Sequence, residues 1–90
     1  MRFYNKTPGR PHGEKPINKV VGKNIKYYFE RSNMTITDFS LAIGNGSNTA
    51  RVKQMFDGEV GCYVEKLQLI AYVLDCKTID LIRSDREEKR

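Results

Sequence analysis

The sequence predicts an all-α fold of five short helices, because apolar residues recur at helical spacing between residues 17 and 82 and no useful stretch alternates apolar and polar residues as a strand does. Glycines and capping residues divide this region into segments of helical length. Ninety residues are enough for one domain with a modest core. We therefore expect a compact helical bundle.

The net charge of +5 is concentrated at the two ends of the chain. Residues 1–16 contain four basic residues, one acidic residue and all three prolines, and are expected to form a flexible basic arm. Residues 17–82, the expected domain, have eight basic and seven acidic residues, and residues 83–90 form a charged tail of mixed sign. A basic arm on a neutral body suits a polyanion binder, but a solvated tail has the same composition, so charge alone does not choose between them.

Periodicity and caps mark the first two helices. Thr35 is suited to cap a second helix over residues 36–43, with Asp38 completing a capping box. Met34 and Phe39 have the spacing of the hydrophobic staple that accompanies such a start. Apolar residues that share one face of the first helix, which is expected to end near residue 32, are Ile17, Val21, Ile25, Tyr28 and Phe29. In the second helix, Ile36, Phe39 and Ile43 are expected to point inward.

Glycines separate the remaining helices. Gly44 suits a left-handed helix end, and Ser47 or Asn48 can cap a third helix that ends at Gly58. We expect Val52, Met55 and Phe56 on the buried side of that helix. The fourth helix starts near Tyr63 with Val64, Leu67, Ile70, Ala71 and Leu74 in register, and a short fifth helix after Thr78 holds Ile79, Leu81 and Ile82.

Two short helices joined by a glycine-containing turn, the second of which exposes polar and basic residues, are typical of a DNA-binding helix-turn-helix, here at about residues 35–58. Gln54 lies on the outward arc of the third helix, where its amide suits bidentate pairing with adenine. Arg51 and Lys53 can reach guanine edges or phosphates. An ordinary solvated face has similar residues, but the segment from Ser47 to Gln54 contains no acid. The candidate DNA-binding residues are Thr35, Ser47, Asn48, Thr49, Ala50, Arg51, Lys53 and Gln54.

The stretch from Val21 to Ile82 resembles the phage-repressor and Cro-like (Xre-type) helix-turn-helix family in the order and spacing of its residues. The resemblance implies a lambda-repressor-like domain of five helices that binds a double-stranded DNA operator as a homodimer and regulates transcription as a repressor. It places Gln54, Ala50 and Thr49 at base-reading positions and Thr35 at a phosphate contact. The matching residues are Ile25, Met34, Thr35, Phe39, Ile43, Gly44, Gly58, Leu67, Ile70, Ala71, Leu74 and the segment 78–82.

This chain departs from the family pattern at three places. Asn45 and Gly46 are two extra residues in the turn, which leaves the register of the third helix open. Phe56 stands where the family usually has Glu, which implies an altered contact between the third helix and its neighbours. Ser40 replaces a usual Ala and keeps the small side chain that close packing of helices needs.

Two other classes of function compete with DNA binding. A protein-interaction module, such as an antitoxin or an adaptor, can use the same fold, and the near-neutral body favours it mildly. An enzyme is disfavoured because no nucleophile is paired with a base, and the one histidine, His12, lies in the arm. We expect no cofactor and no metal.

The remaining residues have structural interpretations. Cys62 and Cys76 are too far apart for a CxxC pair and are expected to be reduced structural thiols. Tyr27, Tyr28 and Tyr72 are expected to be core or boundary aromatics rather than stacking platforms. No segment has the apolar length of a membrane span or a signal peptide, so we expect a cytoplasmic protein without a membrane partner.

Overall fold

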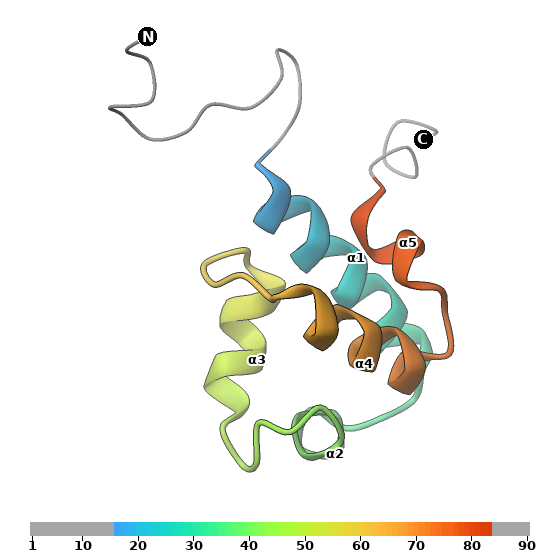
Figure 1. Ribbon diagram of the computed structural model, residues 1–90. Helices are drawn as coiled ribbons and strands as arrows, with labels where there is room; N and C mark the ends of the chain where they lie inside the picture. The colour runs from blue at the N-terminus through green and yellow to red at the C-terminus, as the bar shows by residue number, and fades with distance from the viewer. Residues whose placement is uncertain (1–15, 84–90) are drawn as a thin grey trace, which may run out of the picture.

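The computed structural model describes residues 16–83, which fold into five α-helices and contain no strand (Figure 1). The helices are α1 (Ile17–Arg31), α2 (Ile36–Ala42), α3 (Thr49–Phe56), α4 (Val64–Leu74) and α5 (Thr78–Ile82). The all-α prediction is therefore confirmed, and each of the five predicted segments is a helix. The predicted arm (1–16) and tail (83–90) lie outside the described residues except for Pro16 and Arg83.

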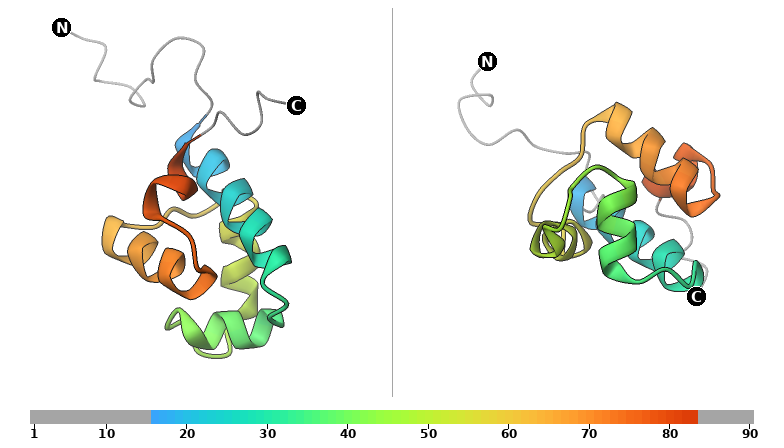
Figure 2. Two further views of the ribbon diagram at one scale, coloured as in Figure 1. Left: turned by 90° about the vertical axis from the view of Figure 1, so that its right-hand side faces the viewer. Right: turned by 90° about the horizontal axis from the view of Figure 1, so that it is seen from below.

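The long helix α1 is the element around which the others pack. It contacts α3, α4 and α5, while α2 packs against α3. In Figure 1, α2 is seen end-on while α3 lies in the plane of the picture. In the view from below in Figure 2, α3 is seen end-on and α2 lies in the plane, so the two helices cross at a steep angle. The contiguous core draws on all five helical segments, and side chains within it that are fully buried are Ile25, Phe39, Ile43, Val52, Ile70 and Leu81.

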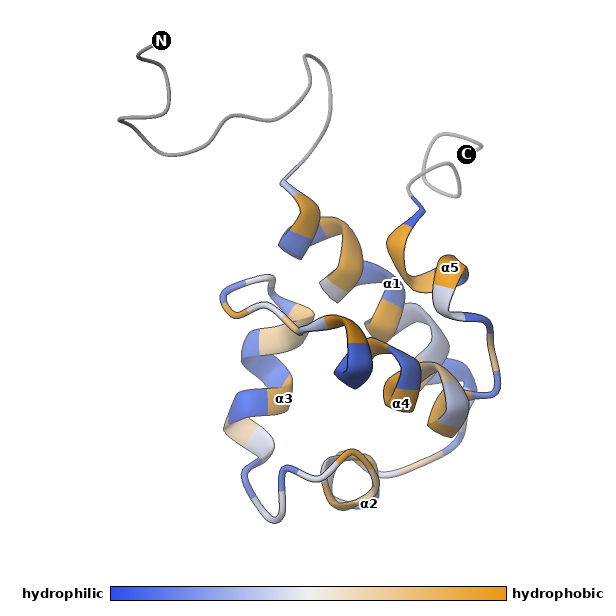
Figure 3. Cartoon of the chain, in the orientation of Figure 1, coloured by the Kyte–Doolittle hydropathy of each residue, from blue (hydrophilic) through white to orange (hydrophobic). Residues whose placement is uncertain are grey.

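Several residues that the periodicity placed inside are exposed. Figure 3 shows apolar residues in every helix, including the first turns of α1 and α4. Ile17 and Val64 are the first residues of α1 and α4, and both side chains are exposed. Ile79 lies on the side of α5 opposite the buried Leu81, and Ile82 is also exposed. The expectation that Tyr72 is a core or boundary residue is wrong, because its position on α4 points away from the core and its side chain is 84% exposed.

The helices α1 and α3 approach each other unusually closely at Gly22. A Cβ atom on Gly22 would lie 2.7 Å from the carbonyl oxygen of Phe56 and closer still to that of Met55. The absence of a side chain at Gly22 therefore sets the distance between the two helices.

No helix within residues 16–83 is long and apolar enough to cross a membrane.

Candidate nucleic-acid interface

Thr35 caps the start of α2 as the sequence predicts, but Asp38 does not complete the predicted capping box, because no hydrogen bond joins its carboxylate to the N–H of Thr35. The Thr35 hydroxyl accepts a hydrogen bond of 3.1 Å from the backbone N–H of Asp38. Met34 is half-buried and packs against the core that contains Phe39. The helix ends one residue earlier than expected, at Ala42, and Gly44 follows in the left-handed conformation with φ = +85°.

Asn45 and Gly46, the two residues that the resemblance treats as an insertion, form an ordered turn that is hydrogen-bonded to α2 on one side and to α4 on the other. On the α2 side, the N–H of Asn45 donates to the carbonyl of Ser40 at 2.9 Å, and the buried Ser40 hydroxyl donates to the carbonyl of Gly46 at 2.7 Å. On the α4 side, the ammonium of Lys66 donates to Oδ1 of Asn45 at 2.8 Å. The insertion is therefore part of the framework that holds α3, and Ser40 does more than provide a small side chain.

Replacing Ser40 with Ala is expected to destabilise the domain by about 1 kcal/mol, because it removes the hydroxyl that satisfies the Gly46 carbonyl. Urea denaturation followed by circular dichroism measures this. Ser47→Ala in the same turn is the control, since Ser47 is exposed. Equal midpoints for the two variants would show that the Ser40 bond does not stabilise the turn.

The start of α3 is capped by Asn48, whose Oδ1 accepts a 3.2 Å hydrogen bond from the N–H of Arg51. Of the two predicted caps, Asn48 is thus the one used, and Ser47 lies in the turn. Two buried side chains, Val52 and Met55, hold the helix against the core. Gly58 follows its end with φ = +77°.

Phe56 joins α3 to both α1 and α2. Its ring lies 5.3 Å from that of Phe29 and 6.3 Å from that of Phe39, measured between centroids. An acidic residue at this half-buried position could not make these contacts. The contacts among these three rings hold the C-terminal end of α3 against α1 and α2.

The predicted site residues are accessible, and seven of the eight are brought together on the turn and on α3. Thr35 is also exposed but stands apart, at the opposite end of α2 from the turn. Of the seven, only Thr49 is half-buried, and the exposed ones are Ser47, Asn48, Ala50, Arg51, Lys53 and Gln54.

The exposed face of α3 is electropositive over its first turns. Arg51 and Lys53 form no ion pair with any residue between 16 and 83, and the nearest acids in sequence, Asp57 and Glu59, come after the helix. At the C-terminal end, the ammonium of Lys19 donates to the carbonyl of Asp57 at 3.0 Å, where a cation compensates the negative end of the helix dipole. A polyanion would therefore meet uncompensated positive charge beside the polar side chains.

A partly open pocket lies between α3 and the start of α4, and the sequence reasoning missed it. Arg51 lines it from α3, Lys66 from α4 and Asn45 from the turn, with Cys62 and Tyr63 of the connecting loop also on its wall. Burial raises the pKa of the half-buried Cys62 thiol, an effect that the positive charges of Lys66 and Arg51 partly oppose. No local sequence signal connects residues 45, 51 and 66, because only the tertiary fold brings them together.

Nothing in residues 16–83 forms a group of three or more histidine, cysteine, aspartate or glutamate side chains placed to hold a metal. Cys62 and Cys76 are half-buried and are not joined in a disulfide. Tyr27 and Tyr28 are half-buried and pack edge to face at 5.0 Å between ring centroids, as boundary aromatics do.

No protein-family model, no curated protein and no solved structure matches this chain. The function must therefore be argued from the surfaces of α2, α3 and α4 themselves.

Proposed function

We propose that this protein is a sequence-specific, double-stranded-DNA-binding repressor of transcription that acts in the cytoplasm as a homodimer. In this proposal the domain has a lambda-repressor-like fold, α2 and α3 form the helix-turn-helix, and α3 is the recognition helix. The observation that carries the proposal is the exposed surface from Ser47 to Gln54, which contains no acid and belongs to a helix that the buried Val52 and Met55 hold against the core.

The dimensions of α3 suit the major groove. An α-helix with its side chains is about 10–12 Å across, and the groove is about 12 Å wide. Helices α2 and α3 cross at a steep angle (Figure 2), as the two helices of a helix-turn-helix do. The ring cluster around Phe56 and the bonds of the inserted turn limit the movement of α3 at both of its ends.

Each exposed residue has a role in this proposal. Gln54 reads adenine through its amide, and Ala50 contacts a thymine methyl group. Arg51 and Lys53 bind guanine edges or phosphates. The residues at the start of α3, Ser47, Asn48 and Thr49, lie at the positive end of the helix dipole, where they contact bases or the DNA backbone. Thr35 contacts a backbone phosphate at the start of α2.

Gln54→Ala and Lys53→Ala are expected to affect binding differently. Loss of the Gln54 amide should cost about 1–3 kcal/mol on the preferred duplex and relax the preference at one base pair. Loss of the Lys53 charge should weaken binding to all sequences evenly and lower the salt dependence. Fluorescence anisotropy with a preferred duplex and a scrambled duplex measures both. If Gln54→Ala binds both duplexes as the unaltered protein does, the base-reading role of Gln54 is wrong.

A protein-interaction module is the second candidate function, and exposed apolar side chains on α4 and α5 favour it. Tyr72 is 84% exposed, Ile79 is 54% exposed, and Ile82 and Leu69 are also exposed. A dimer contact of the proposed repressor would use such residues as well. A lysate pull-down that yields one stoichiometric protein, with no duplex retained from random genomic fragments, would favour the interaction module over DNA binding.

A further inference from the structure

The pocket between α3 and α4 carries two positive charges and no negative one. Arg51 and Lys66 both line it, and no acidic side chain does. The ammonium of Lys66 is bonded to a neutral amide, that of Asn45, and forms no ion pair with any residue between 16 and 83. Burial raises the pKa of Cys62 above the ordinary thiol value, so the thiol is neutral at physiological pH and adds no negative charge.

Arg51 connects this pocket to the proposed DNA-binding face. The residue is exposed on α3, three positions before Gln54, and it also lines the pocket. A duplex positioned for Gln54 to read a base therefore has its backbone near Arg51. The pocket therefore holds a guanidinium from α3 and an ammonium from α4, and both groups commonly bind phosphate oxygens.

We propose that this pocket binds one phosphate group of the DNA backbone, with Arg51 and Lys66 as its two cationic ligands and Asn45 as the residue that positions Lys66. This inference rests on the proposed function and extends its contacts from α3 to α4. It also gives a role to the inserted turn. Asn45 holds the Lys66 ammonium at 2.8 Å on the pocket wall without neutralising it, which a carboxylate there would do.

A salt titration of Lys66→Gln tests the phosphate contact. The variant should bind a preferred and a scrambled 30-base-pair duplex with equally reduced affinity, and the slope of log affinity against log salt should fall by about 1, the loss of one phosphate contact. Lys66→Arg should keep the slope, because the charge remains. Lys26→Gln is the control, since Lys26 is exposed on α1 and does not line the pocket.

The positioning role of Asn45 is tested by a double-mutant cycle. Asn45→Ala alone should lower duplex affinity, and adding it to Lys66→Gln should cause no further loss, because Asn45 acts through Lys66. Additive losses would overturn the positioning role. Thermal unfolding of each variant separates a binding effect from a folding defect.

Cys62 provides a reporter inside the pocket. In a Cys76→Ser background it is the only thiol of the chain, and bound duplex should slow its alkylation several-fold. Millimolar inorganic phosphate should slow it far less, because free phosphate lacks the remaining DNA contacts. Equal protection by phosphate and duplex, with an unchanged salt slope for Lys66→Gln, would show a site for free anions and overturn the DNA assignment.

The proposed function and the pocket assignment can be contradicted separately. If the unaltered protein binds no duplex in a salt-dependent manner, both the proposed function and the pocket assignment are wrong. If the unaltered protein binds duplex and Lys66→Gln has the same slope, only the pocket assignment is wrong.

Discussion

Gly22→Ala is expected to destabilise the domain by about 3 kcal/mol, at the upper end of the range for overpacking, because the added methyl group meets carbonyl oxygens of the α3 backbone. In an unobstructed helix the same change would stabilise by about 1 kcal/mol, so even the sign of the effect reports the close approach of α1 and α3. Thermal unfolding should show a melting temperature lower by roughly 10 °C or more.

The same variant should also bind DNA more weakly, since α3 must move away from α1 to admit the methyl group. Lys26→Ala is the matched control, because Lys26 is exposed on the same helix. A melting temperature for Gly22→Ala equal to or above that of the unaltered protein would contradict the packing of α1 against α3.

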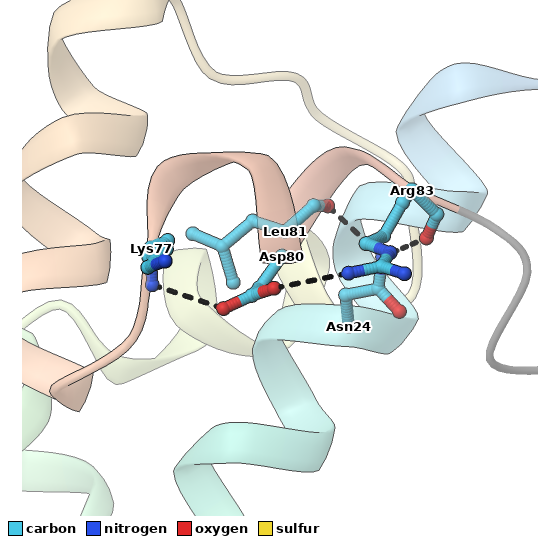
Figure 4. Close-up of polar contacts among 5 residues, drawn as sticks. All are labelled: Asn24, Lys77, Asp80, Leu81 and Arg83. Atoms are coloured by element: carbon cyan, nitrogen blue, oxygen red, sulfur yellow. Dashed lines mark hydrogen bonds and ion pairs between the residues drawn. The ribbon is translucent and has the colours of Figure 1, made fainter.

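Asn24→Asp is expected to have a larger effect on stability, about 3–5 kcal/mol at neutral pH. Asn24 is 2% exposed, and its amide nitrogen donates to the carbonyls of Leu81 at 3.0 Å and Arg83 at 2.7 Å (Figure 4). These bonds join α1 to the end of α5. A carboxylate in place of the amide cannot donate and would place a buried negative charge against two carbonyl oxygens.

The penalty of Asn24→Asp should depend on pH. Burial beside carbonyl oxygens raises the folded-state pKa of the new carboxyl above its unfolded value of about 3.9. The unfolded state then releases its proton first as pH rises, so the deficit relative to the unaltered protein is small below about pH 4 and grows toward pH 7. Asn24→Leu removes the two bonds without adding a charge, and its deficit should be about 1–3 kcal/mol and independent of pH. Urea denaturation of the three proteins between pH 4 and pH 7 measures this, and equal deficits for Asp and Leu at pH 7 would contradict it.

The number of helices and their caps could be predicted because they depend on neighbouring residues. The Thr35 cap involves a residue three positions away, and the left-handed Gly44 depends on its own backbone. The buried face of α3 follows from the spacing of Val52 and Met55. Such local patterns predict helix ends and buried faces without knowledge of how the helices pack together.

Features that depend on distant residues could not be predicted. Asn24 lies on the buried side of α1, but its partners are 57 and 59 residues away. Gly22 gives no sign in the sequence of the carbonyl groups of α3 that face it. Periodicity also overestimated burial at Ile17, Val64 and Ile79, because a helix face is buried only where another element covers it.

The candidate site also has one part that local sequence predicts and one part that depends on distant residues. The exposed face of α3 could be derived from one helix, with Gln54 and Lys53 both exposed as expected. The role of the inserted turn could not, because Asn45 is fixed by Ser40 and by Lys66, 21 residues further on. The pocket lined by Arg51 and Lys66 could not be predicted either, because only the folded domain brings these two residues together.

Selection from a pool of random duplex DNA, followed by a salt titration on the enriched sequence, tests the central claim most directly. A homodimeric helix-turn-helix repressor should enrich a two-fold symmetric sequence whose half-sites lie about 34–36 Å apart, and should bind it more weakly as salt increases. Recovery of no common sequence, with equal weak binding to every duplex, would contradict the assignment of α3 as a recognition helix.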